Sequence, residues 1–247
     1  MSARPAVNAA AARPGLLASV ASLAEMELAL AAGVDIVDLK NPARGALGAW
    51  DEAALVAAVA LWRVAGGSTG LSATVGDHAL SADAIAPAAR RTAEAGVPLV
   101  KIGLPLPRAN AGAALAPVLA ALAPLARETR LIAVLFADQA PDLAVVPLFA
   151  RAGFHGVMLD TADKAAGGLR RHLGREELGR FVTTAQRLGL LTGLAGSLAL
   201  EDIAPLAALG PDYLGFRGAL CAEGRTGALD PARLALVRDA LRSRAAA

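Results

Sequence analysis

One unit recurs along this sequence of 247 residues: a helical segment, a glycine and a short apolar run. Five copies are plain: LAAGVDIVDLK, AEAGVPLVKIG, ARAGFHGVMLD, QRLGLLTGLAG and AALGPDYLGFRG. Glycine just past a helix tolerates the left-handed conformation that ends it. The run that follows is rich in Val, Ile and Leu, as expected for a strand buried on both faces. The repeat therefore predicts a parallel sheet whose strands alternate with helices.

The remaining apolar runs complete a set of eight expected strands, over residues 16–20, 35–40, 71–75, 98–103, 130–136, 155–160, 190–195 and 212–217. Helical patterns separate them. The first helix opens with a capping box formed by Ser22 and Glu25, and the last opens with Asp230 as its cap and Pro231 in its first turn. Eight such units in a chain of this length predict a single α/β domain, a (β/α)8 TIM barrel over residues 15–247.

A doubly wound open sheet is the alternative fold. Such a sheet normally carries a glycine-rich dinucleotide-binding turn after its first strand, and the segment ASVASLAE is not one. Residues 1–14 are expected to form a short disordered lead, with no internal domain boundary after them. Their sequence has no continuous apolar core, which argues against a secretory signal.

Composition excludes several classes of partner. The net charge is only +2 and aromatic residues make up 3%, so a nucleic-acid partner is not expected. The longest apolar stretch, residues 111–126, contains two prolines and is short for a membrane span. The single cysteine, Cys221, excludes an internal disulfide and fits a reducing compartment. We therefore expect a cytoplasmic protein without membrane contact, and the outer surface, rich in Ala and Leu, is compatible with a homo-oligomer.

Lysine is nearly absent. Of 24 basic residues, three are lysine and the other 21 (24 minus 3) are arginine. Lys40 ends the second expected strand two residues after Asp38, so both side chains lie on one face. Lys101 ends the fourth strand, and Lys164 follows Asp160, which ends the sixth. The active site of a TIM barrel lies at these carboxyl ends. The alternative, a lysine that simply reaches solvent at a strand end, explains one such position better than three.

Chemistry gives a reason for lysine over arginine at these positions. Guanidinium stays protonated, whereas an amine can lose its proton when it is buried or surrounded by other cations. A neutral amine attacks a carbonyl to form an imine, and the imine then accepts electrons from the neighbouring carbon. A nearby carboxylate or second lysine can move the protons. The lysines therefore predict Schiff-base chemistry on a carbonyl substrate.

The last two strand ends indicate that the substrate carries phosphate. Gly196 and Ser197 follow the seventh strand, and Arg217 and Gly218 follow the eighth. Loops after these two strands commonly bind phosphate in such barrels. The alternative interpretation of the Gly-Ser pair is a turn with a helix cap. Three further residues near strand ends are candidates for the site: Asn41, Asp77 and Asp138.

Nothing in the sequence indicates a metal site, because the three histidines and the acidic residues show no ligand spacing, and no cofactor is expected. No spacing of serine, histidine and acidic residues indicates a catalytic triad.

Six motifs in consistent order resemble the (5-formylfuran-3-yl)methyl phosphate synthase family: DIVDLKNPARGALGA, SATVGD, LVKIGL, MLDTADK, LAGS and FRGALC. The resemblance runs from about Leu16 to Cys221. It implies a lyase that joins two glyceraldehyde 3-phosphate molecules into a phosphorylated furan aldehyde, with loss of phosphate and water, for furan-containing one-carbon carriers of the methanofuran type. It also implies that Lys40 is the Schiff-base lysine and that Asp38, Lys101, Asp160 and Lys164 are its catalytic companions.

The sequence departs from the family at the loop after Lys40. The family often has an acidic residue and serine around the glycine, where this chain has ARGALGA, and Arg44 could instead contact phosphate. Two other functions stay open at this point. One is a different Schiff-base aldolase acting on sugar phosphates, and the other is a non-catalytic barrel that binds a phosphorylated metabolite.

Overall fold

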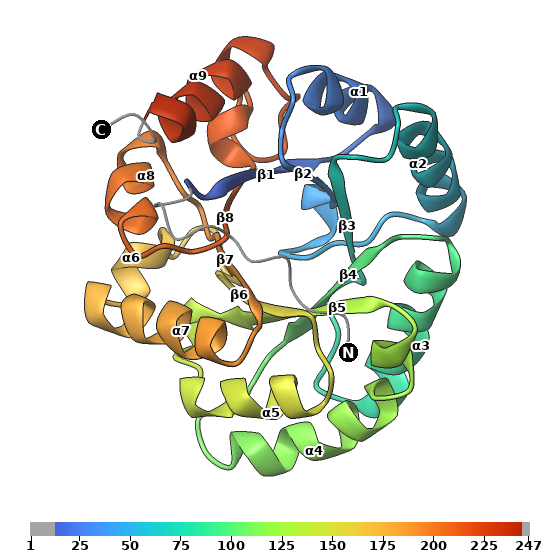
Figure 1. Ribbon diagram of the computed structural model, residues 1–247, viewed down its shortest axis with the longest axis vertical. Coiled ribbons are helices and arrows are strands. Elements are labelled where there is room, and N and C mark those ends of the chain that lie inside the picture. The colour runs from blue at the N-terminus through green and yellow to red at the C-terminus, as the bar shows by residue number, and fades with distance from the viewer. Residues whose placement is uncertain (1–12, 244–247) are drawn as a thin grey trace.

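The structure is a computed structural model, and it describes residues 13–243. The disordered lead expected over residues 1–14 thus falls, for its first 12 residues, outside the described residues. From Gly15 onward the chain forms a ring of strands enclosed by helices (Figure 1). In the part of the chain that is described, no helix is long and apolar enough to cross a membrane.

The strands form a closed barrel in sequence order, with each strand parallel to its neighbours and β8 paired to β1. The eight strands are β1 (Gly15–Val20), β2 (Ile36–Leu39), β3 (Gly70–Thr74), β4 (Leu99–Leu104), β5 (Arg130–Phe136), β6 (Gly156–Asp160), β7 (Leu191–Leu194) and β8 (Tyr213–Phe216). Each lies within one residue of its expected bounds, and the TIM barrel predicted from the repeat is confirmed.

The helices surround the barrel (Figure 1). They are α1 (Leu23–Ala31), α2 (Glu52–Val64), α3 (Ala82–Glu94), α4 (Ala111–Leu122), α5 (Val146–Arg151), α6 (Leu169–His172), α7 (Arg175–Arg187), α8 (Leu200–Ala207) and α9 (Pro231–Arg242). The connection from β6 to β7 therefore carries a short extra helix that the eightfold alternation did not predict. Five 3-10 turns complete the connections: η1 (Pro42–Arg44), η2 (Leu125–Arg127), η3 (Ala137–Gln139), η4 (Leu143–Val145) and η5 (Gly218–Leu220).

The glycines of the repeat end the helices as predicted. All five adopt positive φ angles, between 68° and 91°: Gly33, Gly96, Gly153, Gly189 and Gly210. The expected caps of the first and last helices are also present. The Ser22 side chain accepts from the Glu25 N–H, and the Asp230 side chain accepts from the first turn of α9.

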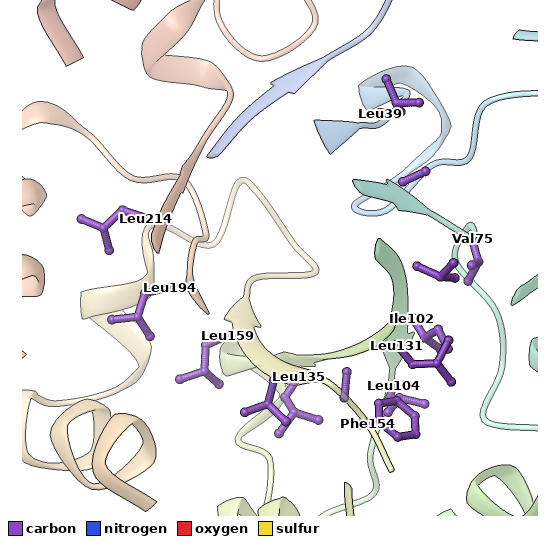
Figure 2. Packing of buried hydrophobic residues seen from close by; sticks show 14 of the residues in the cluster. Leu39, Val75, Ile102, Leu104, Leu131, Leu135, Phe154, Leu159, Leu194 and Leu214 are labelled. Carbon is purple, nitrogen blue, oxygen red and sulfur yellow. The ribbon is translucent and has the colours of Figure 1, made fainter. Parts of the chain in front are cut away.

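Alternation along each strand divides the apolar residues into two cores. One set of side chains points outward and packs beneath the helices, as Figure 2 shows for Leu39, Ile102, Leu135, Leu159 and Leu214. The other set fills the barrel interior with residues such as Leu17, Ile132, Met158 and Tyr213. Because the inward set becomes polar toward the carboxyl ends of β2, β4 and β6, the same alternation that builds the core delivers charged side chains to the mouth.

Candidate active site

A cavity of about 380 Å³ opens at the carboxyl ends of the strands, within the range of small-molecule sites. Its walls include all three lysines of the chain, together with Asp160 and the loops after β7 and β8. The structure therefore brings together three lysines that span 124 positions of the sequence (164 minus 40). The other predicted carboxylate, Asp38, lies behind the wall and has no exposed surface.

Asp38 is held in a row of polar side chains across three adjacent strands. In the strand register Asp38 stands opposite Ser19 on β1 and Ser72 on β3. Both serine hydroxyls donate to its carboxylate, at 2.9 Å and 2.7 Å respectively. Lys101 Nζ lies 3.0 Å from Asp38 Oδ2. Burial by itself would raise the pKa of Asp38, but the charges of Lys101 and Lys40 and the Ser72 hydrogen bond outweigh it, so the pKa is lowered.

Lys101 is buried with its partner and only 1% exposed. Burial lowers the pKa of Lys101, the Asp38 carboxylate opposes that effect, and the charge of Lys40 adds to it; the net direction is downward. Such an amine can hold or release a proton closer to neutral pH than an exposed lysine can. The pair thus has the properties of a general base with its orienting carboxylate.

A second carboxylate, Asp160, stands between two lysines. Lys164 Nζ donates to Asp160 Oδ1 at 2.6 Å, and Lys40 Nζ lies 3.7 Å from Asp160 Oδ2. Burial alone would raise the pKa of Asp160, but Lys164 and Lys40 overcome this and hold the pKa at about 2. Asp160 is therefore ionised, and burial, with Lys40 adding to it, lowers the pKa of Lys164 despite that carboxylate.

Lys40 is the least committed of the three amines. Lys164 donates to Asp160 and also to the backbone carbonyl and hydroxyl oxygens of Thr161. Lys101 is held at 3.0 Å by its buried carboxylate. Within residues 13–243, the Lys40 ammonium has only the loose 3.7 Å ion pair, and its side chain is on the cavity wall. An amine that need not break strong hydrogen bonds is the best placed of the three to attack a carbonyl.

The loops after β7 and β8 bound the cavity on the other side. Gly196 and Ser197 both have positive φ angles, 109° and 47°. A Cβ atom on Gly196 would lie 3.0 Å from Thr161 Cγ2 and 3.1 Å from Thr161 N, so glycine lets this loop pass close to the end of β6. Gly218 begins η5 and also lines the cavity. These three predicted phosphate-binding residues therefore lie together.

Arg217, the fourth predicted phosphate-binding residue, also lines the cavity, but its guanidinium is bound by other groups of the protein. All five N–H groups of its guanidinium are used within the protein, by the Glu25 carboxylate and by the backbone carbonyls of Ser19, Arg225 and Gly227. It is 7% exposed. The side chain therefore ties the start of α1 to the loop after β8 and leaves no donor for a substrate.

The three further candidates organise loops and do not line the cavity. Asn41 accepts from the Ala43 N–H and caps η1. Asp77 accepts from the Leu47 N–H at 3.2 Å, which holds the loop after β2 over the barrel. Asp138 accepts from two N–H groups, those of residues 162 and 163, and so shapes the loop after β6. Arg44, the residue that departs from the family, lines a separate pocket of about 160 Å³ together with Asn41.

Sequence reasoning missed five residues of this region: Ser19, Ser72, Thr161, Arg225 and Glu25. The two serines had a signal, because each is a polar residue inside an apolar strand run. Glu25 was recognised only as a helix cap, and nothing marked Arg225 among 21 arginines. No group of three or more His, Cys, Asp or Glu that could hold a metal ion occurs in the described part of the chain.

Comparison with known proteins matches residues 16–238 to the model of a family described as 4-HFC-P synthase. The (5-formylfuran-3-yl)methyl phosphate synthase of Methanopyrus kandleri is 35% identical over 224 residues, covering 86% of this chain and 91% of that protein. The chain belongs to the 4-HFC-P synthase family. A candidate synthase of the same name from Methylorubrum extorquens is 42% identical, covering 96% of this chain and 95% of that protein. The resemblance read from the motifs is confirmed.

Solved structures support the fold of this family member independently. Phosphoribosyl anthranilate isomerase from Thermotoga maritima superposes with a TM-score of 0.68 at 11% identity, covering 93% of this chain and 99% of that one. A KGPDC structure from Streptococcus mutans superposes with a TM-score of 0.63 at 13% identity, covering 93% and 98%. At such low identities the likeness shows the barrel alone.

Proposed function

We propose that this protein is a (5-formylfuran-3-yl)methyl phosphate synthase that condenses two molecules of glyceraldehyde 3-phosphate through an imine on Lys40. One observation carries the proposal: the uncommitted amine of Lys40 lies on the cavity wall beside two buried lysine–carboxylate pairs. The family membership supports the same activity. The product would serve the biosynthesis of furan-containing one-carbon carriers.

The first step forms the imine. Lys40 Nζ attacks the aldehyde carbon of one triose phosphate, and the carbonyl oxygen leaves as water. Lys101 then removes a proton from the adjacent carbon, and the electron pair moves toward the iminium nitrogen to give an enamine. Asp38 does not reach the cavity, so Lys101 is assigned as the base and Asp38 as the carboxylate that orients it.

The second triose loses a proton from its C2 and phosphate from its C3 to give 2-hydroxypropenal, and the enamine carbon attacks the terminal CH2 carbon of this species to form the new carbon–carbon bond. The C2 hydroxyl of the second triose then attacks the iminium carbon and closes the ring, and loss of one water followed by departure of the Lys40 amine gives the aromatic furan. Asp160 and Lys164 carry protons to the departing oxygens and from the attacking one. The atoms balance when two triose phosphates lose one phosphate and two molecules of water. Formation of the aromatic ring makes the overall reaction favourable.

The phosphate that stays with the product is assigned to Gly196, Ser197 and Gly218. Backbone that follows strands seven and eight of a TIM barrel frequently binds phosphate. Gly196 contributes close backbone approach, because a Cβ there would press on Thr161. Ser197 adds a hydroxyl donor on the cavity wall.

The test is to trap the imine. The protein is incubated with glyceraldehyde 3-phosphate, borohydride is added, and the modified peptide is located by mass spectrometry. We expect an adduct on Lys40, with furan absorbance and phosphate release in a reaction without borohydride. The Lys40→Arg variant keeps the positive charge but removes the nucleophile, and we expect it to form no adduct there and no furan.

Other outcomes would separate the alternatives. An adduct on Lys101 or Lys164 would retain the chemistry and overturn our assignment of roles. An adduct without a furan chromophore would indicate a simpler aldolase. Binding of the triose without adduct or phosphate release, or near-normal turnover by Lys40→Arg, would contradict the covalent mechanism.

A further inference from the structure

The loop after β8 carries a cation that the mechanism above does not use. Arg225 lines the cavity and is only partly exposed. Two hydrogen bonds hold the backbone around Arg225: Arg217 Nε donates to the Arg225 carbonyl at 2.8 Å, and Arg217 Nη2 donates to the Gly227 carbonyl at 2.7 Å. The bridge between Cys221 and Leu229 closes the base of this loop. These contacts hold the backbone that carries Arg225 in one position.

The Arg225 guanidinium reaches the loop after β2. Arg225 Nη2 donates to the carbonyl of Gly45, at 2.9 Å, and Gly45 lies five residues after Lys40 on the loop after β2. In the barrel, β8 and β2 are separated by β1. The hydrogen bond therefore joins the loop after β8 to the loop after β2, the two loops that flank the end of β1.

Most of the hydrogen-bonding capacity of Arg225 is unused. Among the described residues its guanidinium makes this one hydrogen bond, whereas Arg217 uses all five donors. The charge also acts on the site, because Arg225 contributes to lowering the pKa of Lys164, after burial and Lys40. A planar cation with free donors on a cavity wall matches the geometry of a phosphate group.

We propose that Arg225 binds the phosphate of the second triose, the one that supplies the carbon attacked by the enamine. This deepens the proposed function and rests on it. Two triose phosphates bring two phosphate groups, and the corner formed by Gly196, Ser197 and Gly218 accounts for one. The Arg225 guanidinium, held at the loop after β2 by the Gly45 carbonyl, provides a second phosphate subsite, so that the two trioses enter with their phosphates apart and their reacting carbons near Lys40 and Lys101.

The first test counts phosphate subsites with a probe that cannot react. Glycerol 3-phosphate has no carbonyl and forms no imine, so calorimetric titration measures the subsites without depending on the proposed chemistry. We expect two molecules bound per wild-type chain. In Arg225→Gln one site should weaken by about tenfold or more, because charge-assisted hydrogen bonds are lost, while the other stays unchanged. A single site in the wild type, or two unaltered sites in the variant, would overturn the proposal.

Matched variants exclude a general effect. Arg44→Gln removes a cation from another mouth loop, outside the catalytic cavity, and should keep both sites. Arg225→Lys keeps the charge but loses the planar fork, and should weaken the second site by a smaller factor than Arg225→Gln. It also tests the subsite if Arg225→Gln fails to fold, which circular dichroism would reveal. Equal weakening by Arg44→Gln, or wild-type affinity in Arg225→Lys when Gln cannot be tested, would contradict the assignment.

A second readout separates the two trioses. With glyceraldehyde 3-phosphate and borohydride, Arg225→Gln should still give the Lys40 adduct at the wild-type level, while furan formation falls about tenfold or more. Loss of the adduct in parallel with the furan would place Arg225 at the first triose and overturn the proposal. Absence of the adduct in the wild type would instead reject the proposed function, and the glycerol 3-phosphate count would still decide whether Arg225 binds phosphate.

Discussion

Lys101 Nζ lies 3.0 Å from Asp38 Oδ2, with the lysine 1% exposed on the cavity wall and the aspartate wholly enclosed behind it. This pair is an ion pair inside the barrel, where removing one partner leaves a buried charge without compensation. The two serines that donate to Asp38 fix its carboxylate, so Lys101 has one defined position from which to act.

Removing both members of this pair should destabilise the barrel by less than the two single removals added together. We expect Asp38→Asn to lower the free energy of unfolding by roughly 3–5 kcal/mol, because it leaves the buried Lys101 charge without its partner. The double variant Asp38→Asn/Lys101→Met should lose less than the sum of the single variants. Urea unfolding of the four proteins measures this coupling, and strictly additive losses would show that the pair does not interact.

The pH dependence of catalysis should follow Lys101. Its pKa is lowered by burial, while Asp38 pushes it upward. A base must be deprotonated, so kcat/KM should rise with pH along a limb centred below 10.5, the ordinary value for lysine. In Asp38→Asn the upward influence is lost, and the limb should move to lower pH. Ser72→Ala, which removes one hydrogen bond and no charge, is the control and should move the limb less. A limb that stays in place or moves to higher pH in Asp38→Asn would mean that another group is the base.

The barrel itself could be predicted from the sequence because its signals are local. A glycine that ends a helix, as at Gly33 or Gly153, adopts a positive φ angle, and the steric reason for it lies in the neighbouring residues of the chain. The apolar run after the glycine is typical of a strand that is buried on both faces. The five charged residues of the site could also be predicted from the sequence. Strand ends meet at one face of a barrel whatever the details of packing, so Asp38, Lys101 and Asp160 were placed correctly by topology alone.

What sequence could not show were the contacts made by long side chains across loops. Arg217 follows a strand, as a phosphate ligand would, yet its guanidinium is turned to Glu25, which is 192 residues away in the sequence. Arg225 looks like any surface arginine until the loop that Arg217 holds is folded. Asp77 and Asp138 likewise follow strands but accept from backbone N–H groups of neighbouring loops. Such partners depend on three-dimensional loop paths that no periodicity encodes.

The role of Arg217 can be tested against its earlier interpretation as a phosphate ligand. Arg217→Lys should lower the free energy of unfolding by roughly 3 kcal/mol, because it breaks a buried, bidentate pair with Glu25. Glu25→Gln should have a similar effect although Glu25 does not line the cavity. The double variant should be little worse than either. If Arg217→Lys instead raised KM with unfolding unchanged, the side chain would be a substrate ligand after all.

Acid should remove a stabilising contribution that Asp160 provides. Its pKa is about 2 in the folded protein against an ordinary value of 3.8, so its contribution is complete above 3.8 and is lost as pH falls through about 2. The gap corresponds to about 2 kcal/mol. Asp160→Asn should be less stable than the wild type at pH 5, and the difference should shrink by about that amount on going to pH 2. Asp163→Asn changes an exposed carboxylate three residues along and is the control. Chemical unfolding across this pH range decides the matter, and a wild-type advantage over Asp160→Asn that is undiminished at pH 2 would show that Asp160 does not gain stability from its two lysines.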